Sequence, residues 1–210
     1  MSAKRAYVSP LREQSAARTR EQILRRATEL FADRGYGLVT VADIAKAAGV
    51  SPKTVFASVG AKGDILDRIV DQGVAASGHE RAVELVYALR TPREVLAALA
   101  HGTRVGNERH FQVHEAIHKA LPVHEDGEAL WRRATAAYRD AVTTAARHLH
   151  TLPSAPAATA TATAEETADT LWFWFGPSSW RTLVVENGWP WDRAEEFLRG
   201  TAIATLCPDA

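Results

Sequence analysis

Apolar side chains recur every three or four positions along most of the chain, which is the spacing that puts them on one face of an α-helix. A clear short example is residues 40–49, where the apolar positions are Val41, Ile44, Ala45 and Ala48. Thr40 and Asp43 form a variant capping box at the start of this segment. Gly49 supplies a residue that tolerates the left-handed conformation at a helix end. We therefore predict a helix that begins at Thr40 and stops at Gly49.

A second short helix is predicted directly after it. Ser51 followed by Pro52 is typical of an N-cap and a first helical position. Val55 and Val59 lie four positions apart and face inward, which turns small or polar side chains outward or to the flank: Lys53, Thr54, Ala57 and Ser58. Two short helices joined by a tight turn predict a helix-turn-helix, whose second helix enters the DNA major groove. The alternative is ordinary hairpin packing in an all-helical protein.

The flanking segments favour the DNA-binding interpretation. Residues 19–35 predict a supporting helix, with one apolar stripe of Ile23, Ala27, Leu30 and Phe31 and arginines elsewhere on its surface. From about Lys62 onward every strong pattern is helical, and helices are predicted from Lys62, from Thr91, around 111–117, and over 125–150, 167–187 and 191–206. The predicted fold class is all-α, with an N-terminal three-helix helix-turn-helix domain and a C-terminal helical domain for ligand binding and dimerisation.

The C-terminal part contains an unusual aromatic helix. Residues 171–175, Leu-Trp-Phe-Trp-Phe, are apolar on every side for more than one turn, so they must be covered all round. Gly176 and Pro177 follow and should bend this helix, because proline removes one backbone hydrogen bond. The stretch 151–164 before it is rich in Ala, Thr and Pro, has too little bulk to bury, and predicts a mobile loop.

Charge divides the chain in the same way. The net charge of zero combines a part up to residue 62, with 11 basic and 5 acidic residues, and a remainder with 14 basic and 20 acidic residues. A basic N-terminal third is expected of a polyanion binder. We predict a DNA-binding domain over 1–62 and an effector-binding and dimerisation domain over 63–210. Four basic residues are expected ahead of the first helix, as a mobile arm on DNA or as plain disorder: Lys4, Arg5, Arg12 and Arg18.

Residues 19–66 resemble the DNA-binding domain of the tetracycline-repressor (TetR) family. The shared motifs are LFADRGY, TVADIAKAAGVS, TVF and a Lys shortly before Ile65 and Leu66. The resemblance implies phosphate contacts by Thr40 and Lys62. It also implies contacts to bases or the adjoining backbone by Ser51, Pro52, Lys53 and Ala57, with Lys53 as the main base reader, and flank or phosphate contacts by Thr54 and Ser58.

The chain departs from the family pattern on the second helix of the motif. Phe56 stands where the family usually has Tyr, and Ser58 and Val59 stand where it often has His and Phe. Phe56 is still counted in the DNA-binding surface, but it cannot donate a hydroxyl to a phosphate, which predicts a lower intrinsic affinity. The family resemblance further implies a homodimer through the last two long helices. Two recognition helices would then lie about 34–36 Å apart on a near-palindromic operator.

A small-molecule effector site is predicted where the kink leaves space beside aromatic walls. Its expected residues are His110, His114, Trp131, Tyr138, Trp172, Phe175 and Trp180. His110, His114 and His118 follow one another at a spacing of four residues and should share a helical face. This face could line the pocket, be solvated, or hold a metal ion through two histidines with Glu115, His101 or His124, giving a metal-responsive regulator.

Other function classes find little support. The chain has no glycine-rich phosphate loop, no GxSxG motif and no paired-carboxylate motif, so we expect no enzyme and no cofactor. The single Cys207 excludes an internal disulfide and a cysteine-cluster metal site. With no signal peptide and no long apolar run, a soluble cytoplasmic protein is expected. A ligand-responsive repressor is the favoured function; the alternatives are an architectural DNA-binding protein and a helical carrier with a vestigial N-terminal lobe.

Overall fold

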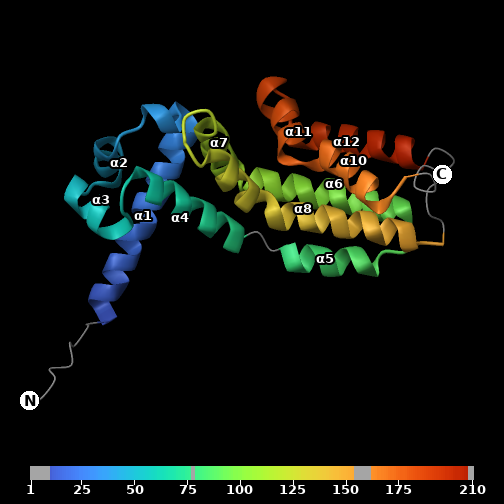
Figure 1. Cartoon of the computed structure of the whole chain (residues 1–210), viewed down its shortest axis with the longest axis horizontal. Coiled ribbons are helices and arrows are strands. Elements are labelled where there is room, and N and C mark those ends of the chain that lie inside the picture. Colours follow the sequence, from blue (N-terminus) through green and yellow to red (C-terminus); the bar gives the residue numbers. More distant parts are fainter. Residues whose placement is uncertain (1–9, 77–78, 154–161, 208–210) are drawn as a thin grey trace, which may run out of the picture. The chain divides into compact units, whose positions relative to one another are not determined.

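The computed structural model describes residues 10–76, 79–153 and 162–207, which form helices and their connections without a strand (Figure 1). The predicted all-α fold class is confirmed. The described chain forms two compact units, and each has its own core. The first unit consists of residues up to Gly73 together with Gln112–Trp131, and the second of Val74–Phe111 and the residues from Arg132 onward.

The first unit is built on the long helix α1 (Pro10–Arg34), whose apolar stripe packs against α2 (Val41–Ala48) and α3 (Pro52–Val59). A single turn, η1 (Tyr36–Leu38), connects α1 to α2, and α4 (Lys62–Ala75) follows α3. Helix α7 (Phe111–Ala120) and the first turn of α8 (Gly127–Thr151) complete the unit. The core side chains are fully or nearly fully buried and include Ile23, Ala27, Phe31, Ile44, Val55, Val59, Ile65, Leu66 and Ile117.

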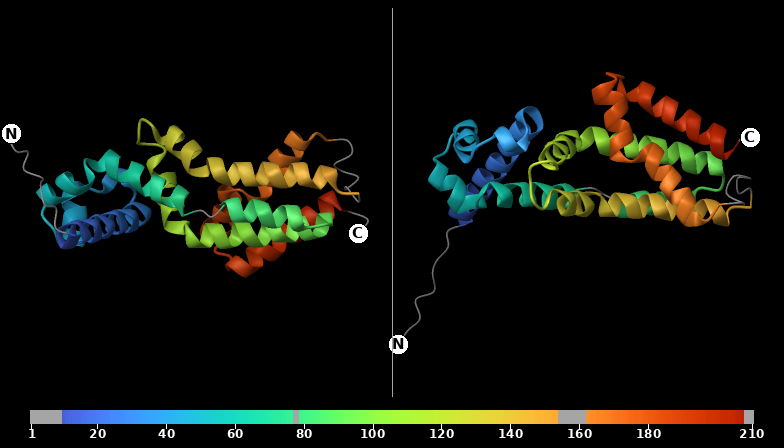
Figure 2. Two further views of the ribbon diagram at one scale, coloured as in Figure 1. Left: turned by 90° about the horizontal axis from the view of Figure 1, so that it is seen from below. Right: turned by 45° about the horizontal axis from the view of Figure 1, so that its top comes forward.

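The second unit is a bundle in which α6 (Pro92–Arg109), most of α8, α10 (Ala164–Phe175) and α12 (Trp191–Leu206) lie side by side (Figure 2). Helix α5 (His79–Ala88) packs against α6. Two short pieces, α11 (Pro177–Arg181) and the π-helical turn η2 (Thr182–Glu186), connect α10 to α12. The core draws on all of these elements, with Leu96, Ala100, Val142, Leu149, Leu171, Phe175, Trp180, Leu198 and Ala202 among its buried residues.

Several expected boundaries differ from the structure. Helix α1 begins nine residues earlier than expected, at Pro10, so Arg12 and Arg18 lie on this helix and not in an arm ahead of it. The early turns of α1 are polar and exposed, so no apolar stripe signalled them. Lys4 and Arg5 lie outside the described residues. Helix α5 was not predicted, and among the residues on it whose burial is described only Val86 is buried.

The compact units also divide at places other than the expected break after residue 62. Helix α4 packs with the first unit as far as Gly73, and 112–131 return to that unit because their side chains pack on α1, η1 and α4. The expected loop over 151–164 mostly lies outside the described residues. At its two ends Thr151 still belongs to α8, and Thr163 caps α10. Within the described ranges no helix is long and apolar enough to cross a membrane.

Candidate nucleic-acid interface and aromatic cluster

The two short helices α2 and α3 begin at the predicted side-chain caps. The Thr40 hydroxyl accepts from the Asp43 N–H at 3.1 Å, and the Thr40 N–H donates to the Asp43 carboxylate at 2.9 Å. The Ser51 hydroxyl accepts from the Thr54 N–H at 3.1 Å. Gly49 ends α2 in the left-handed conformation, with φ 66° and ψ 30°. The predicted starts of both helices and the end of α2 are confirmed.

Burial determines which face of α3 points outward. Val55 and Val59 are fully buried under this helix. The residues predicted to touch DNA lie on the remaining faces and at the helix start: Thr40, Ser51, Pro52, Lys53, Phe56 and Ala57 are exposed, and Thr54 and Ser58 are half-buried. All of these side chains are therefore at least partly accessible on the first unit, as contact with DNA requires. Their contact with DNA stays a prediction.

Lys62 has an arrangement that the sequence did not indicate. Its ammonium group donates to the carbonyl oxygens of Tyr36 at 3.0 Å and Val39 at 3.1 Å, and lies 4.2 Å from the centre of the Tyr36 ring. Both carbonyls belong to the turn between α1 and α2. The side chain thus fastens the start of α4 to this turn. A phosphate contact by the ammonium group would require these bonds to break.

Three other long-range donors satisfy carbonyl groups at the ends of helices in the first unit. Gln22 donates to the Ala48 carbonyl at the end of α2 at 3.0 Å, and Arg68 donates to the Val59 carbonyl at the end of α3 at 3.1 Å. Lys119 of α7 donates to the Ala32 and Asp33 carbonyls at the end of α1, the latter at 3.0 Å. These carbonyls have no partner within their own helix, and cations near a helix C-terminus are favourable. The sequence analysis missed all three donors.

The turn after α7 packs on the turn between α1 and α2. The His124 and Tyr36 rings meet edge to face, with centroids 5.2 Å apart. A Cβ placed on Gly37 would lie 3.6 Å from a methyl group of Val123, so the backbone there is close to that side chain. The His124 Nδ1 accepts from the Asp126 N–H at 3.1 Å, which holds the ring in place. Residues 119–126 are therefore part of the support beneath the helix-turn-helix.

The capping carboxylate of α2 has a perturbed ionisation. Hydrogen bonds from the Thr40 side chain and backbone lower the pKa of Asp43 below its usual value, and the guanidinium of Arg34 at 3.7 Å adds to this effect. Asp43 is consequently a carboxylate at neutral pH, and its charge lies at the N-terminal end of α2, where a negative charge is favourable.

Four of the predicted ligand residues lie together in the second unit. Tyr138 of α8 and Trp172 of α10 meet edge to face, with centroids 5.4 Å apart. The Phe175 carbonyl accepts hydrogen bonds from the Tyr138 hydroxyl and from the Trp180 Nε1, the latter at 3.1 Å. Asn107 of α6 donates to the Tyr138 oxygen at 2.9 Å, and this residue was not predicted. Burial raises the pKa of the Tyr138 phenol, so the hydroxyl stays protonated and keeps donating.

The break between α10 and α11 explains why the Phe175 carbonyl is available. In a continuous helix the Ser179 N–H would donate to the Phe175 carbonyl, but at the break it donates to the Gly176 carbonyl at 3.2 Å. Pro177 likewise has no N–H to donate to the Phe173 carbonyl, and the Ser179 hydroxyl donates to that carbonyl instead. The predicted bend is a full interruption, with Gly176 in an extended conformation between the two helices. Phe175 and Trp180 are buried core residues, while Tyr138 and Trp172 are half-buried. The last two are therefore the members of this cluster that an effector can reach; binding there stays a prediction.

The other predicted ligand residues are distributed differently. Trp131 and His114 belong to the first unit, where their rings meet edge to face at 6.4 Å. His110 belongs to the second unit and is the C-cap of α6, with φ −100° and ψ 14°. Burial lowers the pKa of His110, and the neighbouring Arg109 lowers it further. The single aromatic site expected from the sequence is thus divided between two compact units.

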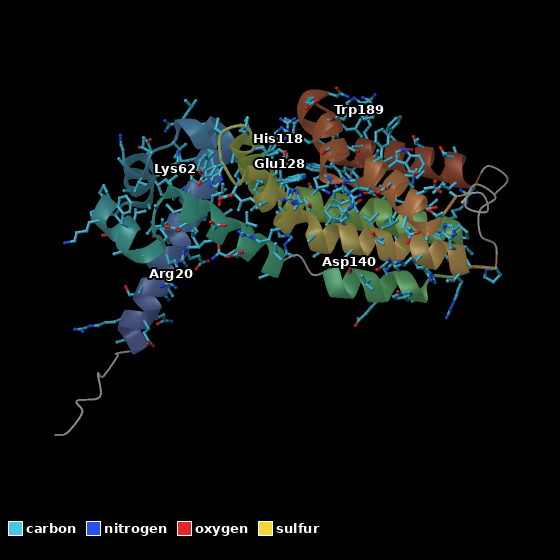
Figure 3. The ribbon with its side chains drawn as sticks, viewed as in Figure 1. Arg20, Lys62, His118, Glu128, Asp140 and Trp189 are labelled. Carbon is cyan, nitrogen blue, oxygen red and sulfur yellow. The ribbon has the colours of Figure 1, made fainter. Side chains whose placement is uncertain are left out.

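The histidines do not form the expected stripe. Because α7 begins at Phe111, His110 ends one helix while His114 and His118 lie on the next. His114 is half-buried and His118 is exposed (Figure 3). In the part of the chain that the structure describes, no three His, Cys, Asp or Glu side chains are grouped as a metal site requires. The metal-responsive alternative therefore gains no support from the structure.

Comparisons with known proteins agree with the geometry of the first unit. The family model described as "Bacterial regulatory proteins, tetR family" matches residues 23–69. The HTH-type transcriptional regulator TcmR of Streptomyces glaucescens is 42% identical over 55 residues. This stretch is 26% of the present chain and 24% of TcmR, so the match spans about a quarter of that relative's length.

Solved structures resemble the chain over most of its length. The TetR family transcriptional regulator PfmR from Thermus thermophilus is 18% identical with a TM-score of 0.65, and the match covers 90% of this chain and 95% of PfmR. The fatty acid degradation regulator FadR from Bacillus halodurans is 15% identical with a TM-score of 0.67, covering 90% and 96%. A putative transcriptional regulator from Saccharomonospora viridis, solved in complex with choline, is 20% identical with a TM-score of 0.63, covering 91% and 97%. At these identities the similarity establishes the fold.

Proposed function

We propose that the chain, whose residues 23–69 match the model of the TetR family of bacterial regulatory proteins, is a homodimeric repressor that a small molecule releases from a near-palindromic DNA operator. The proposed role is that of a transcriptional regulator and not of an enzyme, and the match of residues 23–69 to the family model supports it. The observation that carries the proposal is the exposed face of α3, which presents Lys53 to solvent. The buried side chains Val55 and Val59 and the Ser51 N-cap hold this helix in place. A partner of this kind, chromosomal DNA, implies a cytoplasmic protein.

The support under α3 favours DNA binding over ordinary hairpin packing. Side chains from α1, α4 and α7 satisfy the carbonyl groups at the ends of α1, α2 and α3, and Lys62 fastens the turn before α2. Base reading requires a helix held in one orientation, because a contact misplaced by about 1 Å loses its hydrogen-bond geometry. These supporting contacts also argue against the helical-carrier alternative, in which the N-terminal lobe is vestigial.

Exposed apolar side chains on the last helices favour a dimer. Phe173 of α10 is 74% exposed, Phe197 of α12 is 50% exposed and Val185 of η2 is 39% exposed. Apolar surface of this kind marks a contact surface. In the proposed dimer a second copy covers these residues, and the two α3 helices then lie about 34–36 Å apart, one turn of DNA.

The proposed effector binds the second unit at the half-buried members of the aromatic cluster, Tyr138 and Trp172. Asn107 and the guanidinium of Arg139, which lies 5.0 Å from the centre of the Trp172 ring, supply polar groups beside them. The effector prefers a conformation in which the two α3 helices no longer match the operator spacing. Differential affinity of about 1–3 kcal/mol, or 5- to 150-fold, is the usual size of such coupling.

Footprinting on genomic fragments tests the DNA-binding part of the proposal. The expected result is a protected site with two related half-sites, bound by a species that sizes as a dimer in solution. Lys53→Met is the matched variant, since Lys53 is exposed and its loss should reduce sequence preference without affecting folding. Uniform coating of DNA without a preferred site would favour the architectural alternative, and a protein that remains a single chain would overturn the dimer.

The effector part needs a separate measurement. Native mass spectrometry of the purified protein should detect a co-purifying small molecule, and its removal should tighten operator binding. Tyr138→Phe and Trp172→Leu should each weaken its retention, while Leu85→Ser serves as a control at an exposed residue of the same unit outside the cluster. A molecule retained equally by all variants would place the effector site elsewhere.

A further inference from the structure

The exposed face of α3 carries apolar side chains where a surface exposed only to water would favour polar ones. Phe56 is 53% exposed, and the next residue, Ala57, is exposed as well. Helix α3 cannot rotate to hide them, since Val55 and Val59 on its other face are fully buried. The position of the phenyl ring on the outer surface is therefore fixed by the core of the first unit.

The polar side chains beside these two residues are already used. The Ser51 and Thr54 hydroxyl groups lie 2.8 Å apart and hydrogen-bond to each other, and the Ser51 hydroxyl also caps α3. Lys53, by contrast, is exposed, and within the described residues no hydrogen bond or ion pair engages its ammonium group. Apart from the half-buried Ser58 hydroxyl at the flank, the outward chemistry of α3 beyond its first turn is thus one ammonium group and one apolar patch.

These groups form one continuous surface. Lys53, Phe56 and Ala57 are related as i, i+3 and i+4, which places them side by side on a helix. At about 1.5 Å per residue, Lys53 and Ala57 are about 6 Å apart along the axis, just under two steps of about 3.4 Å along a DNA strand. A helix lying along the groove can therefore present the cation to one base pair and the apolar patch to a base pair one or two steps away.

We propose that Phe56 and Ala57 read the 5-methyl groups of thymine in the operator half-site, next to a guanine read by Lys53. This inference rests on the proposed function and names the bases that this surface recognises. In the major groove thymine alone of the four unmodified bases presents a methyl group, whereas guanine presents two acceptors that suit a lysine. Phe56 therefore exchanges the hydroxyl-to-phosphate contact of a tyrosine for an apolar contact with base edges.

The test uses the full-length protein and a half-site selected from a randomised duplex library. Each thymine is replaced in turn by deoxyuridine, which removes only the methyl group. At one or two thymines within about two base pairs of a guanine, we expect binding to weaken about fourfold, the change that corresponds to burying about one CH₂ equivalent. In a second series, replacing such a T·A pair by C·G should weaken binding, and methylating that cytosine at C5 should restore part of it.

Variants of the protein separate methyl contact from effects of DNA shape. In Phe56→Ser and Ala57→Ser the same deoxyuridine substitutions should change affinity less than twofold, as expected when the apolar partner has been removed. Leu85→Ser, which alters a 61% exposed apolar residue in the second unit, is the matched control and should keep the full fourfold response. Thermal unfolding of each variant verifies that the first unit stays folded.

The outcomes distinguish this inference from the function on which it rests. If the protein selects a half-site but deoxyuridine substitution has no effect, or has an equal effect in the wild type and in Phe56→Ser, the methyl-reading role is overturned and the DNA-binding function stands. If no sequence is selected at all, the proposed function itself fails.

Discussion

Replacing Lys62 by methionine separates two roles that the structure and the family resemblance give to the same side chain. In the structure its ammonium group donates to two carbonyl oxygens at 3.0 and 3.1 Å and lies over the Tyr36 ring. Methionine keeps the length of the side chain but removes the charge and the donors. Hydrogen bonds from a charged donor contribute about 1.5–3 kcal/mol, and an exposed cation–π contact about 0.5–1 kcal/mol. Because the site is half-exposed and water can replace the lost donor, we expect a loss of about 2 kcal/mol in the first unit.

Hydrogen exchange measured by mass spectrometry suits this prediction, because peptides from each unit report separately. A loss of about 2 kcal/mol corresponds to about 30-fold faster exchange by opening of the first unit. Amides of α2, α3 and α4 should show this increase, and amides of α6 and α12 should not change. In calorimetry the same loss lowers the melting temperature of a unit of this size by about 10 °C.

The salt dependence of operator binding measures the other role. Each phosphate neutralised by a cation contributes about −0.9 to the slope of log affinity against log salt concentration. In a dimer, Lys62→Met should leave the slope unchanged once the protein is folded, whereas loss of a direct phosphate contact by Lys62 would reduce its magnitude by about 2. Unchanged exchange in Lys62→Met together with a slope reduced by about 2 would refute the structural role and make Lys62 the phosphate contact that the family position implies.

Three further changes test the units independently. Gly60→Ala should destabilise the first unit by about 1–3 kcal/mol, because φ is +93° there and a new Cβ would lie 2.8 Å from that of Asp64. The control Gly102→Ala, at an open helical position, should be neutral or stabilising in calorimetry. A larger loss of stability in Gly102→Ala than in Gly60→Ala would contradict the backbone strain inferred at Gly60. Tyr138→Phe should lower the stability of the second unit by about 1–3 kcal/mol, seen in its exchange rates, because a buried amide loses its acceptor and a carbonyl loses a donor. The folded-state pKa of Asp43 is lowered, so its contribution is complete above the unfolded pKa and is lost as pH falls below about 4. The melting temperature of Asp43→Asn should accordingly depend less on pH in that range than that of the wild type, and an equal dependence would exclude Asp43 as its source.

Local features of the helix-turn-helix could be predicted from the sequence because their partners are close in the chain. The Thr40 and Asp43 capping box, the Ser51 cap and the left-handed Gly49 each depend on residues within a few positions. The same is true of the Thr91 and Glu94 box at the start of α6. Such bonds form whenever the local helix forms, so a short motif is sufficient to indicate them.

Long-range features could not be predicted in this way. Lys119 reaches a carbonyl 86 residues earlier in the chain, and Gln22 reaches one 26 residues later. The acceptor in each case is a backbone oxygen, which every residue has, so no residue type marks it. The expectation that residues 171–175 are covered all round is correct for Leu171 and Phe175 but wrong for Phe173, which is 74% exposed. Nor did the sequence indicate that the Phe175 carbonyl would become the shared acceptor of Tyr138 and Trp180.

The division of the chain into units leads to a prediction of how binding of the proposed effector would alter DNA binding. After Gly73 the backbone leaves the first unit, it returns at Gln112 and leaves again after Trp131. Residues 112–131 are therefore covalently connected at both ends to helices of the second unit, to α6 through His110 and to α8 beyond Trp131. Within the first unit, Lys119 donates to a carbonyl at the end of α1, and the His124 ring packs on Tyr36. Tyr36 in turn contacts Lys62 at the start of α4. Any rearrangement of α6 or α8 around Tyr138 must either be absorbed at these two chain crossings or move this segment. Because the segment supports the turn that precedes Thr40, a change in its position would alter the orientation of α2 and α3. Helix α4 is then only one of several chain connections through which the proposed effector could act on the DNA-binding helices.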